Sequence, residues 1–137
     1  TFTIPVQIDT PDRMDNLRLV VAYLQKHFDT NIIIGEQKTS ACNIFPGVHY
    51  MPFQHLKTFH RTKMLNDMCM ACNSPIIVNY DCDILLPINQ VIETVELLRS
   101  KQADMVYPYD GSFTHVIRSV WYPKLLRSLS TDILPLI

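Results

Sequence analysis

The sequence of 137 residues lacks any apolar run long enough to span a membrane, and it lacks an excess of charge of either sign. Its net charge of −1 gives no overall basic field, so we expect neither nucleic acid nor an anionic membrane surface as a partner. Hydrophobic residues make up 47% and charged residues 18%, which suits a packed core and argues against disorder. The length predicts a single domain over residues 1–137.

Cysteine is also scarce, and the four residues show no disulfide framework. Cys69 and Cys72 form a C-x-x-C pair within a helical pattern, but no second pair follows at zinc-ribbon spacing. We interpret both as small apolar residues on a helix face. The pattern favours a reducing compartment, so we expect a cytoplasmic location, or membrane association through segments outside this sequence. No signal peptide is evident, and both ends, "TFTIPV" and "DILPLI", look cut from a longer chain.

Strands alternate with helices along most of the sequence. Strands are predicted at 2–8, 31–36, 76–81 and 103–109, and helices at 11–28, 60–72 and from Pro87 onward. Between them, 37–57 is predicted as a loop with a short strand near "VHYM", and "YPKLLRSL" within the mixed segment 110–137 is predicted to start a helix. This alternation indicates an α/β fold, an open and mostly parallel Rossmann-like sheet with helices on both faces.

Polar residues follow each of the first three predicted strands, where ligands of open parallel sheets bind. They are Gln7 and Asp9, Glu36 and Gln37, and Asp81 and Asp83. The last pair belongs to "SPIIVNYDCDILLP", where two carboxylates stand between apolar runs. Carboxylates are costly to desolvate, so such a pair needs a cation, hydrogen bonds or a shared proton. Asp-x-Asp at a strand end suits Mg²⁺ or Mn²⁺ completed by phosphate oxygens, and the alternative is two exposed aspartates in a turn.

A basic cluster opens the helix that leads into the third strand. His60, Arg61 and Lys63 lie in "FHRTKMLN". An arginine at a helix N-terminus is suited to binding an anion, whereas the plainer alternative is a solvated basic turn. A metal ion on one side and Arg61 on the other would together hold a diphosphate.

The segments "TIPVQIDTPDRMDNL", "IIIGEQ", "FHRTKMLN" and "IIVNYDCDILLP" resemble, in this order, successive motifs of nucleotide-diphospho-sugar transferases. These are glycosyltransferases of the GT-A fold, near family 2 and the galactosyltransferase-like group. The resemblance covers residues 2–110. It implies a metal-dependent hexosyltransferase that uses a nucleotide-sugar donor, usually a UDP-sugar, with Mn²⁺ or Mg²⁺, and a glycan or other hydroxyl acceptor. It also implies that an acceptor-binding half is missing or incomplete.

The resemblance assigns roles to individual residues. Asp81 and Asp83 match the D-x-D motif, with Asp83 the main metal ligand and Asp81 holding the ribose or the donor sugar. Arg61 is expected near the donor phosphates, Glu36 matches the acid that helps to seat the nucleoside, and the Pro5–Val6 region lines the base. Asn66 has a structural role. The acceptor base is not identified; Asp104, Asp110 and Asp132 are candidates, of which Asp110 follows a predicted strand, and Trp121 belongs either to a sugar platform or to the core.

Three alternatives remain. Haloacid-dehalogenase-type phosphatases also place D-x-D after an apolar strand, which would make Asp81 the nucleophile, but they expect Thr or Val where this chain has Leu85. A nucleotidyltransferase would show a glycine-rich basic loop after the first strand, and "QIDTPDRMDN" contains no glycine. A non-catalytic fragment that binds a nucleotide-sugar is the third.

Overall fold

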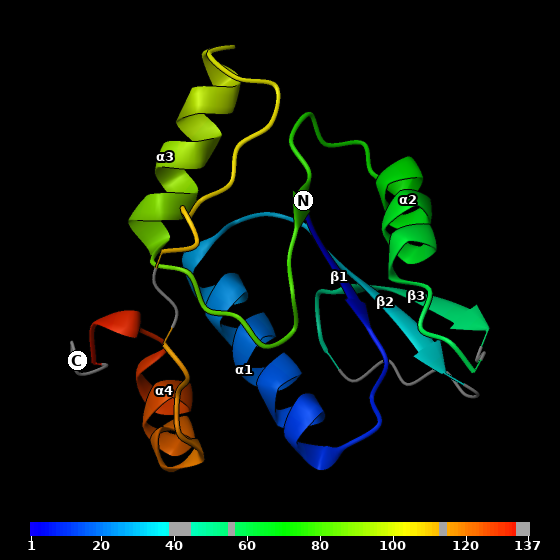
Figure 1. The fold of residues 1–137 in the computed structure, drawn as a ribbon, viewed down its shortest axis with the longest axis vertical. Helices are drawn as coiled ribbons and strands as arrows, with labels where there is room; N and C mark the ends of the chain where they lie inside the picture. Colours follow the sequence, from blue (N-terminus) through cyan, green and yellow to red (C-terminus); the bar gives the residue numbers. More distant parts are fainter. Residues whose placement is uncertain (39–44, 55–56, 113–114, 134–137) are drawn as a thin grey trace. The chain divides into compact units, whose positions relative to one another are not determined.

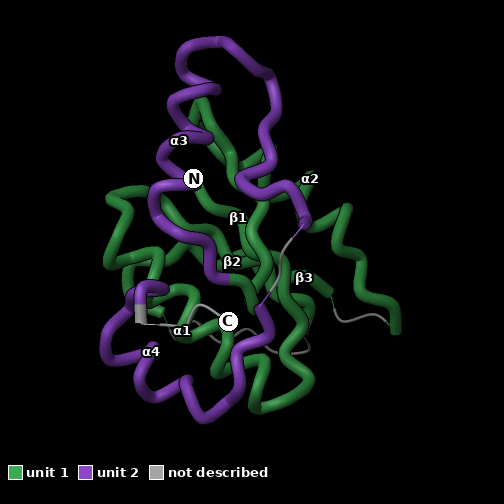
Figure 2. The backbone as a smooth tube through the Cα atoms, turned by 60° about the vertical axis from the view of Figure 1, so that its left-hand side comes forward, with its two compact units in different colours: residues 1–84 green, residues 85–137 purple. Residues whose placement is uncertain are grey.

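The computed structural model describes residues 1–38, 45–54, 57–112 and 115–133, and the chain divides into two compact units, residues 1–84 and residues 85–137 (Figure 2). The first unit contains the sheet and the helices that flank it. The second is helical in the part that the structure describes.

In the first unit, four parallel strands form a sheet in the order β3-β2-β1-β4. They are β1 (Phe2–Val6), β2 (Ile32–Lys38), β3 (His49–Gln54) and β4 (Val78–Asn79), and the helices are α1 (Pro11–His27) and α2 (Arg61–Ala71) (Figure 1). The chain adds β2 and β3 on one side of β1 and then returns to add β4 on the other. The direction of winding therefore reverses between β1 and β4. This arrangement confirms an α/β fold with a parallel sheet.

Helix α1 covers the sheet face that carries Phe2, Ile4 and Val6 of β1. Side chains alternate between the two faces of a strand, and these positions of β1 are almost fully buried. The ring of Phe2 lies 5.3 Å from that of Phe28, which follows α1. Helix α1 buries Leu17, Leu19, Val20, Val21, Tyr23 and Leu24. Its first turn is fixed by Thr10, whose side chain accepts a hydrogen bond from the Arg13 amide, and by Pro11 at the first helical position.

Helix α2 packs on the opposite face, where its buried Met64 and Met68 contact Ile33 of β2. Gly35 permits this close approach. A Cβ atom at that position would lie 2.9 Å from the Met68 Sδ and 3.0 Å from a ring carbon of Phe53. The two helices therefore lie on opposite sides of the sheet, as Figure 1 shows, and the expected layering is confirmed for this unit.

Pro5 marks the point at which β1 and β4 separate. The amides of Val78 and Tyr80 donate to the carbonyls of Thr1 and Thr3, at 2.8 and 3.0 Å. Pro5 follows two residues later and has no N–H to contribute to a ladder on that side. Beyond Tyr80 the described backbone makes no further hydrogen bond with β1, and a crevice opens there between the two segments.

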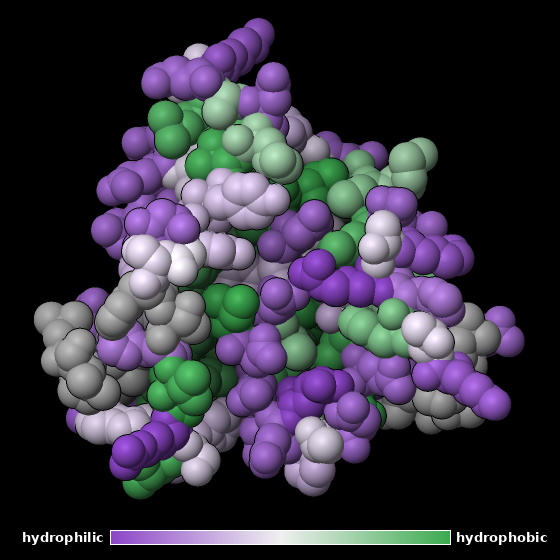
Figure 3. All heavy atoms as spheres, viewed as in Figure 1, coloured by the Kyte–Doolittle hydropathy of each residue, from purple (hydrophilic) through white to green (hydrophobic). Residues whose placement is uncertain are grey.

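The second unit contains α3 (Ile88–Arg99), a 3₁₀ turn (Ser119–Trp121), α4 (Tyr122–Ser128) and a second 3₁₀ turn (Thr131–Ile133). Val91 and Leu125 are its buried apolar residues among those described. Over α3, apolar surface is visible between hydrophilic residues (Figure 3). No helix in the described ranges is long and apolar enough to cross a membrane.

Most predicted elements are confirmed, and one is wrong. The structure places helices at the predicted positions around 11–28, 60–72 and after Pro87, and a strand where "VHYM" was singled out. The predicted strand at 76–81 shortens to two residues. The predicted strand at 103–109 does not exist: these residues form turns and irregular chain, and Met105 and Tyr107 are 73% and 68% exposed. An apolar run forms a strand only where a partner strand and a covered face are available.

Candidate functional site

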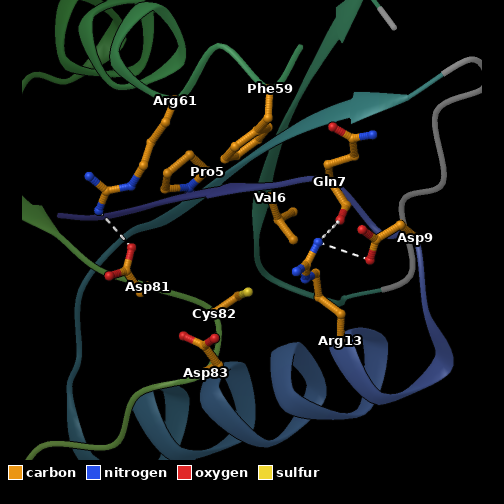
Figure 4. A pocket seen from close by; sticks show the side chains of 10 residues that line it. All are labelled: Pro5, Val6, Gln7, Asp9, Arg13, Phe59, Arg61, Asp81, Cys82 and Asp83. Carbon is orange, nitrogen blue, oxygen red and sulfur yellow. Dashed lines mark hydrogen bonds and ion pairs between the residues drawn. The ribbon is translucent and has the colours of Figure 1, made fainter. Parts of the chain in front are cut away.

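A pocket of about 450 Å³ opens at the carboxyl ends of β1 and β4, where the direction of winding reverses (Figure 4). It is lined by Pro5, Val6, Gln7, Asp9, Arg13, Phe59, Arg61, Asp81, Cys82 and Asp83. Ligands of open parallel sheets bind at this topological position because the loops on either side diverge there. All ten lining residues belong to the unit formed by residues 1–84.

The D-x-D segment is held at the pocket by the buried residue before it. The amide of Tyr80 donates to the carbonyl of Thr3, and its ring packs edge-on against Phe2 at 5.5 Å. Because Tyr80 is anchored in the core, Asp81 emerges half-buried at the crevice and Asp83 is exposed. Asp83 makes no hydrogen bond or ion pair with residues in the described part of the chain.

The α2 side of the pocket contributes Arg61. Its Nη2 lies 2.6 Å from Oδ1 of Asp81, so the first residue of α2 is joined to the loop after β4. The buried side chain of Gln37 supports this arrangement, since its Nε2 donates to the Thr58 carbonyl at 2.9 Å and its Oε1 accepts from the His60 amide at 3.1 Å. Gln37 thereby fixes the chain on both sides of Phe59 and the start of α2.

The α1 side contributes Arg13. Its Nη1 donates to the Gln7 carbonyl at 3.0 Å and lies 2.9 Å from Oδ1 of Asp9. These bonds close the loop between β1 and α1 on itself. In Figure 4 the guanidinium of Arg13 enters the pocket from the side opposite Arg61, with Cys82 between them.

The pKa of the Cys82 thiol reflects the burial and the charges around this residue of the pocket. Burial, more than any other cause, raises the pKa of its thiol to about 11; Asp83 and Asp81 also raise it, whereas Arg13 lowers it. The thiol is therefore neutral at physiological pH. Three carboxylates and two guanidiniums line the pocket, which leaves it with a negative balance in the absence of a ligand. An anionic ligand would enter most favourably together with a cation.

Five of the six predicted binding residues lie together at this pocket. They are Pro5, Val6, Arg61, Asp81 and Asp83. Glu36 is not part of the lining: it lies on β2 in register with Val6 of β1 and Pro52 of β3, and it is 4% exposed. Asn66 is exposed on α2, and Lys63 pairs with Asp67 of the same helix at 2.5 Å.

The candidates for an acceptor base all lie in the second unit. The prediction that Asp110 follows a strand is wrong, because residues 103–109 form no strand. Its Oδ1 accepts hydrogen bonds from the amide and hydroxyl of Ser112, and these lower the pKa of its carboxyl group. Asp132 accepts from the Ser130 hydroxyl at 3.1 Å. The Trp121 ring has the Lys124 ammonium 4.8 Å from its centre, a cation–π contact that occupies one face of the indole. The base therefore remains unassigned.

The carboxylates of the pocket suit a hard divalent cation only when a ligand completes its coordination. No group of three His, Cys, Asp or Glu side chains within the described residues is arranged to hold a metal ion. Asp81 and Asp83 supply two oxygen donors at one pocket, and Mg²⁺ commonly binds through one or two carboxylates together with phosphate oxygens. The donor set fits Mn²⁺ or Mg²⁺ bound jointly with a diphosphate.

Arg13, Phe59 and Cys82 line the pocket but were not predicted from the sequence. Cys82 was evident as the middle residue of the D-x-D, and Phe59 as the neighbour of the basic cluster. The position of Arg13 could also have been recognised from the sequence, because it lies in the first turn of the helix that comes after the first strand. In an open parallel sheet, that position lies at the ligand-binding edge.

No protein-family description, no curated protein and no solved structure matches this chain.

Proposed function

We propose that this chain binds a nucleotide-diphosphate sugar, with a UDP-sugar the first candidate, and that the protein transfers the sugar to a hydroxyl acceptor. The fold would then be that of the GT-A glycosyltransferases. The observation that carries the proposal is the pocket at the β1–β4 junction, which brings the D-x-D carboxylates together with Arg61 of α2. Its volume of about 450 Å³ falls in the range of small-molecule sites.

Each group in the pocket has a defined part in the proposal. Asp83, which is exposed and forms no ion pair with the described residues, is the main metal ligand, and Asp81 is its partner. Arg61 exchanges its bond with Asp81 for bonds to the donor phosphates. Pro5 and Val6 form the apolar wall for the base. Since Glu36 lies beside Val6 on the neighbouring strand and outside the pocket lining, its contribution to seating the nucleoside is indirect.

A divalent ion bound by these carboxylates would stabilise the negative charge that develops on a departing nucleoside diphosphate. The chain's own contribution is to orient that diphosphate and to neutralise its charge with a guanidinium. Without the ion, the acidic excess of the lining would repel a diphosphate. Binding of the donor should therefore depend on the metal.

The proposal is tested by titrating UDP-, GDP- and dTDP-sugars into the protein with and without Mn²⁺, using calorimetry and thermal shift. We expect one nucleotide class to bind only with Mn²⁺. Asp83→Asn should weaken that binding by about tenfold or more, because a charged metal ligand is lost. Asp67→Asn is the matched control: Asp67 is on α2, pairs with Lys63 and does not line the pocket.

Equal affinity of Asp83→Asn and the unaltered protein would reject the assignment of the metal site. A chain that ignores every nucleotide-sugar but hydrolyses p-nitrophenyl phosphate with Mg²⁺ would instead be a phosphatase, and loss of that activity in Asp81→Asn would identify the nucleophile. Donor binding without transfer to any hydroxyl would indicate a non-catalytic binding fragment.

A further inference from the structure

Arg13 reaches the pocket with most of its hydrogen-bonding capacity unused. A guanidinium has five N–H donors, and both of the bonds that Arg13 makes with described residues involve Nη1. Its Nε and Nη2 have no hydrogen-bond partner within the described part of the chain. In Figure 4 this guanidinium lies next to Val6 at the pocket, with its contacts to Gln7 and Asp9 on one side and Cys82 on the other.

We propose that Arg13 is a second anion-binding residue of the pocket, which holds the diphosphate of the ligand from the α1 side while Arg61 holds it from the α2 side. The inference rests on the proposed function for the identity of the ligand as a nucleoside diphosphate derivative. It adds a residue that neither the D-x-D motif nor the basic cluster contains. The chemistry that it recognises is a phosphate or pyrophosphate group.

The anchoring of Arg13 orients its side chain. The Gln7 carbonyl and Asp9 both hold Nη1, so the fork formed by the other nitrogens is fixed before a ligand arrives. A pre-oriented guanidinium loses less conformational entropy when it binds an oxyanion, and its planar fork matches two phosphate oxygens. Arg61, in contrast, must first leave Asp81. Arg13 is therefore the arginine already available to an incoming phosphate.

A purely structural role explains less of the arrangement. The side chains of Arg13 and Asp9 are 42% and 51% exposed, and ion pairs this open to solvent contribute little to stability. A brace for the loop would also have no reason to turn its unused donors toward the pocket. Arg13 lines the same pocket as Asp81 and Asp83, so its positive charge lies where their negative charges need to be balanced. A charged group placed this way is positioned for a ligand that passes between the two helices.

The test measures affinity for inorganic pyrophosphate and for UDP, each with Mn²⁺, by calorimetry. Arg13→Gln should weaken both by about tenfold or more, because a charge-assisted contact is lost. Arg18→Gln is the matched control: Arg18 forms a similar ion pair with Asp15 on the same helix, at 3.3 Å, but does not line the pocket. It should bind both ligands as the unaltered protein does.

Two further variants separate binding from bracing. Asp9→Asn weakens the anchoring of Arg13 but keeps the guanidinium and its bond to the Gln7 carbonyl, and it removes an acidic group from the pocket, so pyrophosphate affinity should fall less than in Arg13→Lys. Arg13→Lys keeps the charge without the fork, and we expect a smaller loss than in Arg13→Gln, with a melting temperature near that of the unaltered protein. This variant tests the proposal even if Arg13→Gln does not fold. Equal losses in Asp9→Asn and Arg13→Lys would show that Arg13 only braces the loop.

The outcomes distinguish this inference from the proposed function. If UDP binds the unaltered protein and Arg13→Gln with equal affinity, Arg13 is not an anion-binding residue, and the donor site stands without it. If pyrophosphate binding depends on Arg13 but no nucleotide binds, the anion site stands and the nucleotide-sugar proposal fails. A protein that binds neither pyrophosphate nor UDP contradicts both.

Discussion

Helices α1 and α2 each bring one arginine from the first turn to the same pocket, but they are held in place in different ways. Helix α1 has 17 residues, a Thr10 cap and Pro11, and six buried side chains. Helix α2 has 11 residues, no side-chain cap and two buried side chains. Arg13 of α1 bonds within its own loop, whereas Arg61 of α2 bonds to Asp81, 20 residues further along the chain. One side of the pocket is therefore set by local sequence, and the other by tertiary packing.

This difference predicts that the α2 side is the more easily disturbed. Met68 is fully buried, and its Sδ occupies the space that Gly35 leaves open, so it carries much of the attachment of α2 to the sheet. Met68→Ala should lower the free energy of unfolding by about 2–5 kcal/mol, because a core side chain is replaced by a cavity. Urea titration measures this change. Met70→Ala is the control, since Met70 on the same helix is 86% exposed and its removal should change stability by less than about 0.5 kcal/mol.

The comparison is sharpened by Leu24→Ala, the corresponding core deletion on α1. This substitution should lower the free energy of unfolding by a similar amount, about 2–5 kcal/mol. In protein that remains folded, however, affinity for UDP should fall more in Met68→Ala than in Leu24→Ala, because α2 has few other buried residues to hold Arg61 in place. Equal losses of affinity would show that both helices position the pocket through the whole core.

The same contrast explains which parts of the fold were predictable from sequence. Thr10, Pro11 and the apolar spacing that follows specify α1 locally, and the helix begins where predicted. The continuous run in "NIIIGE" correctly indicated a strand, and successive residues Ile32, Ile33 and Ile34, which alternate between its two faces, are all buried. Residues 103–109 have similar strand-forming composition, but strand formation depends on a neighbouring strand, which the composition does not encode. The strand order was likewise not contained in the local pattern, because β4 pairs with β1 at the other end of the unit, with Val78 in register with Phe2.

The sequence predicted those residues of the candidate site that lie next to the ends of strands or helices. Asp81 and Asp83 follow a strand, Arg61 opens a helix, and all three lie at the pocket. Glu36 also follows the strand-end rule, yet it is buried and outside the pocket lining, because β1 separates β2 from β4 and the rule does not say which two strands border the pocket. The strand-end rule does not include Arg13, because this residue lies in the first turn of the helix that follows the strand. Only the reversal of winding beside β1 shows that this turn adjoins the D-x-D loop.

The local definition of α1 leads to a smaller predicted effect at its cap. Thr10→Ala removes the side-chain acceptor of the Arg13 amide, a bond of 3.3 Å, and should cost about 1 kcal/mol. Thermal or urea unfolding measures it. Thr62→Ala in the first turn of α2 is the control and should change stability by less than about 0.5 kcal/mol, since α2 has no side-chain cap to lose. A cost in Thr62→Ala equal to that in Thr10→Ala would contradict the distinction between a locally fixed and a packed helix.

The smallest effect is expected from the two arginine–aspartate pairs themselves. The side chains of Arg61 and Asp81 are 48% and 44% exposed, so solvent screens their attraction despite the short contact. Asp81→Asn and Asp9→Asn should each change the free energy of unfolding by less than about 1 kcal/mol, as measured by urea titration at low and high salt. A loss of several kcal/mol in Asp81→Asn would mean that the Arg61–Asp81 pair fastens α2 to the sheet. If neither variant changes the free energy of unfolding appreciably, packing and the cap hold the helices in place. The charged groups at the pocket can then exchange their partners for a ligand.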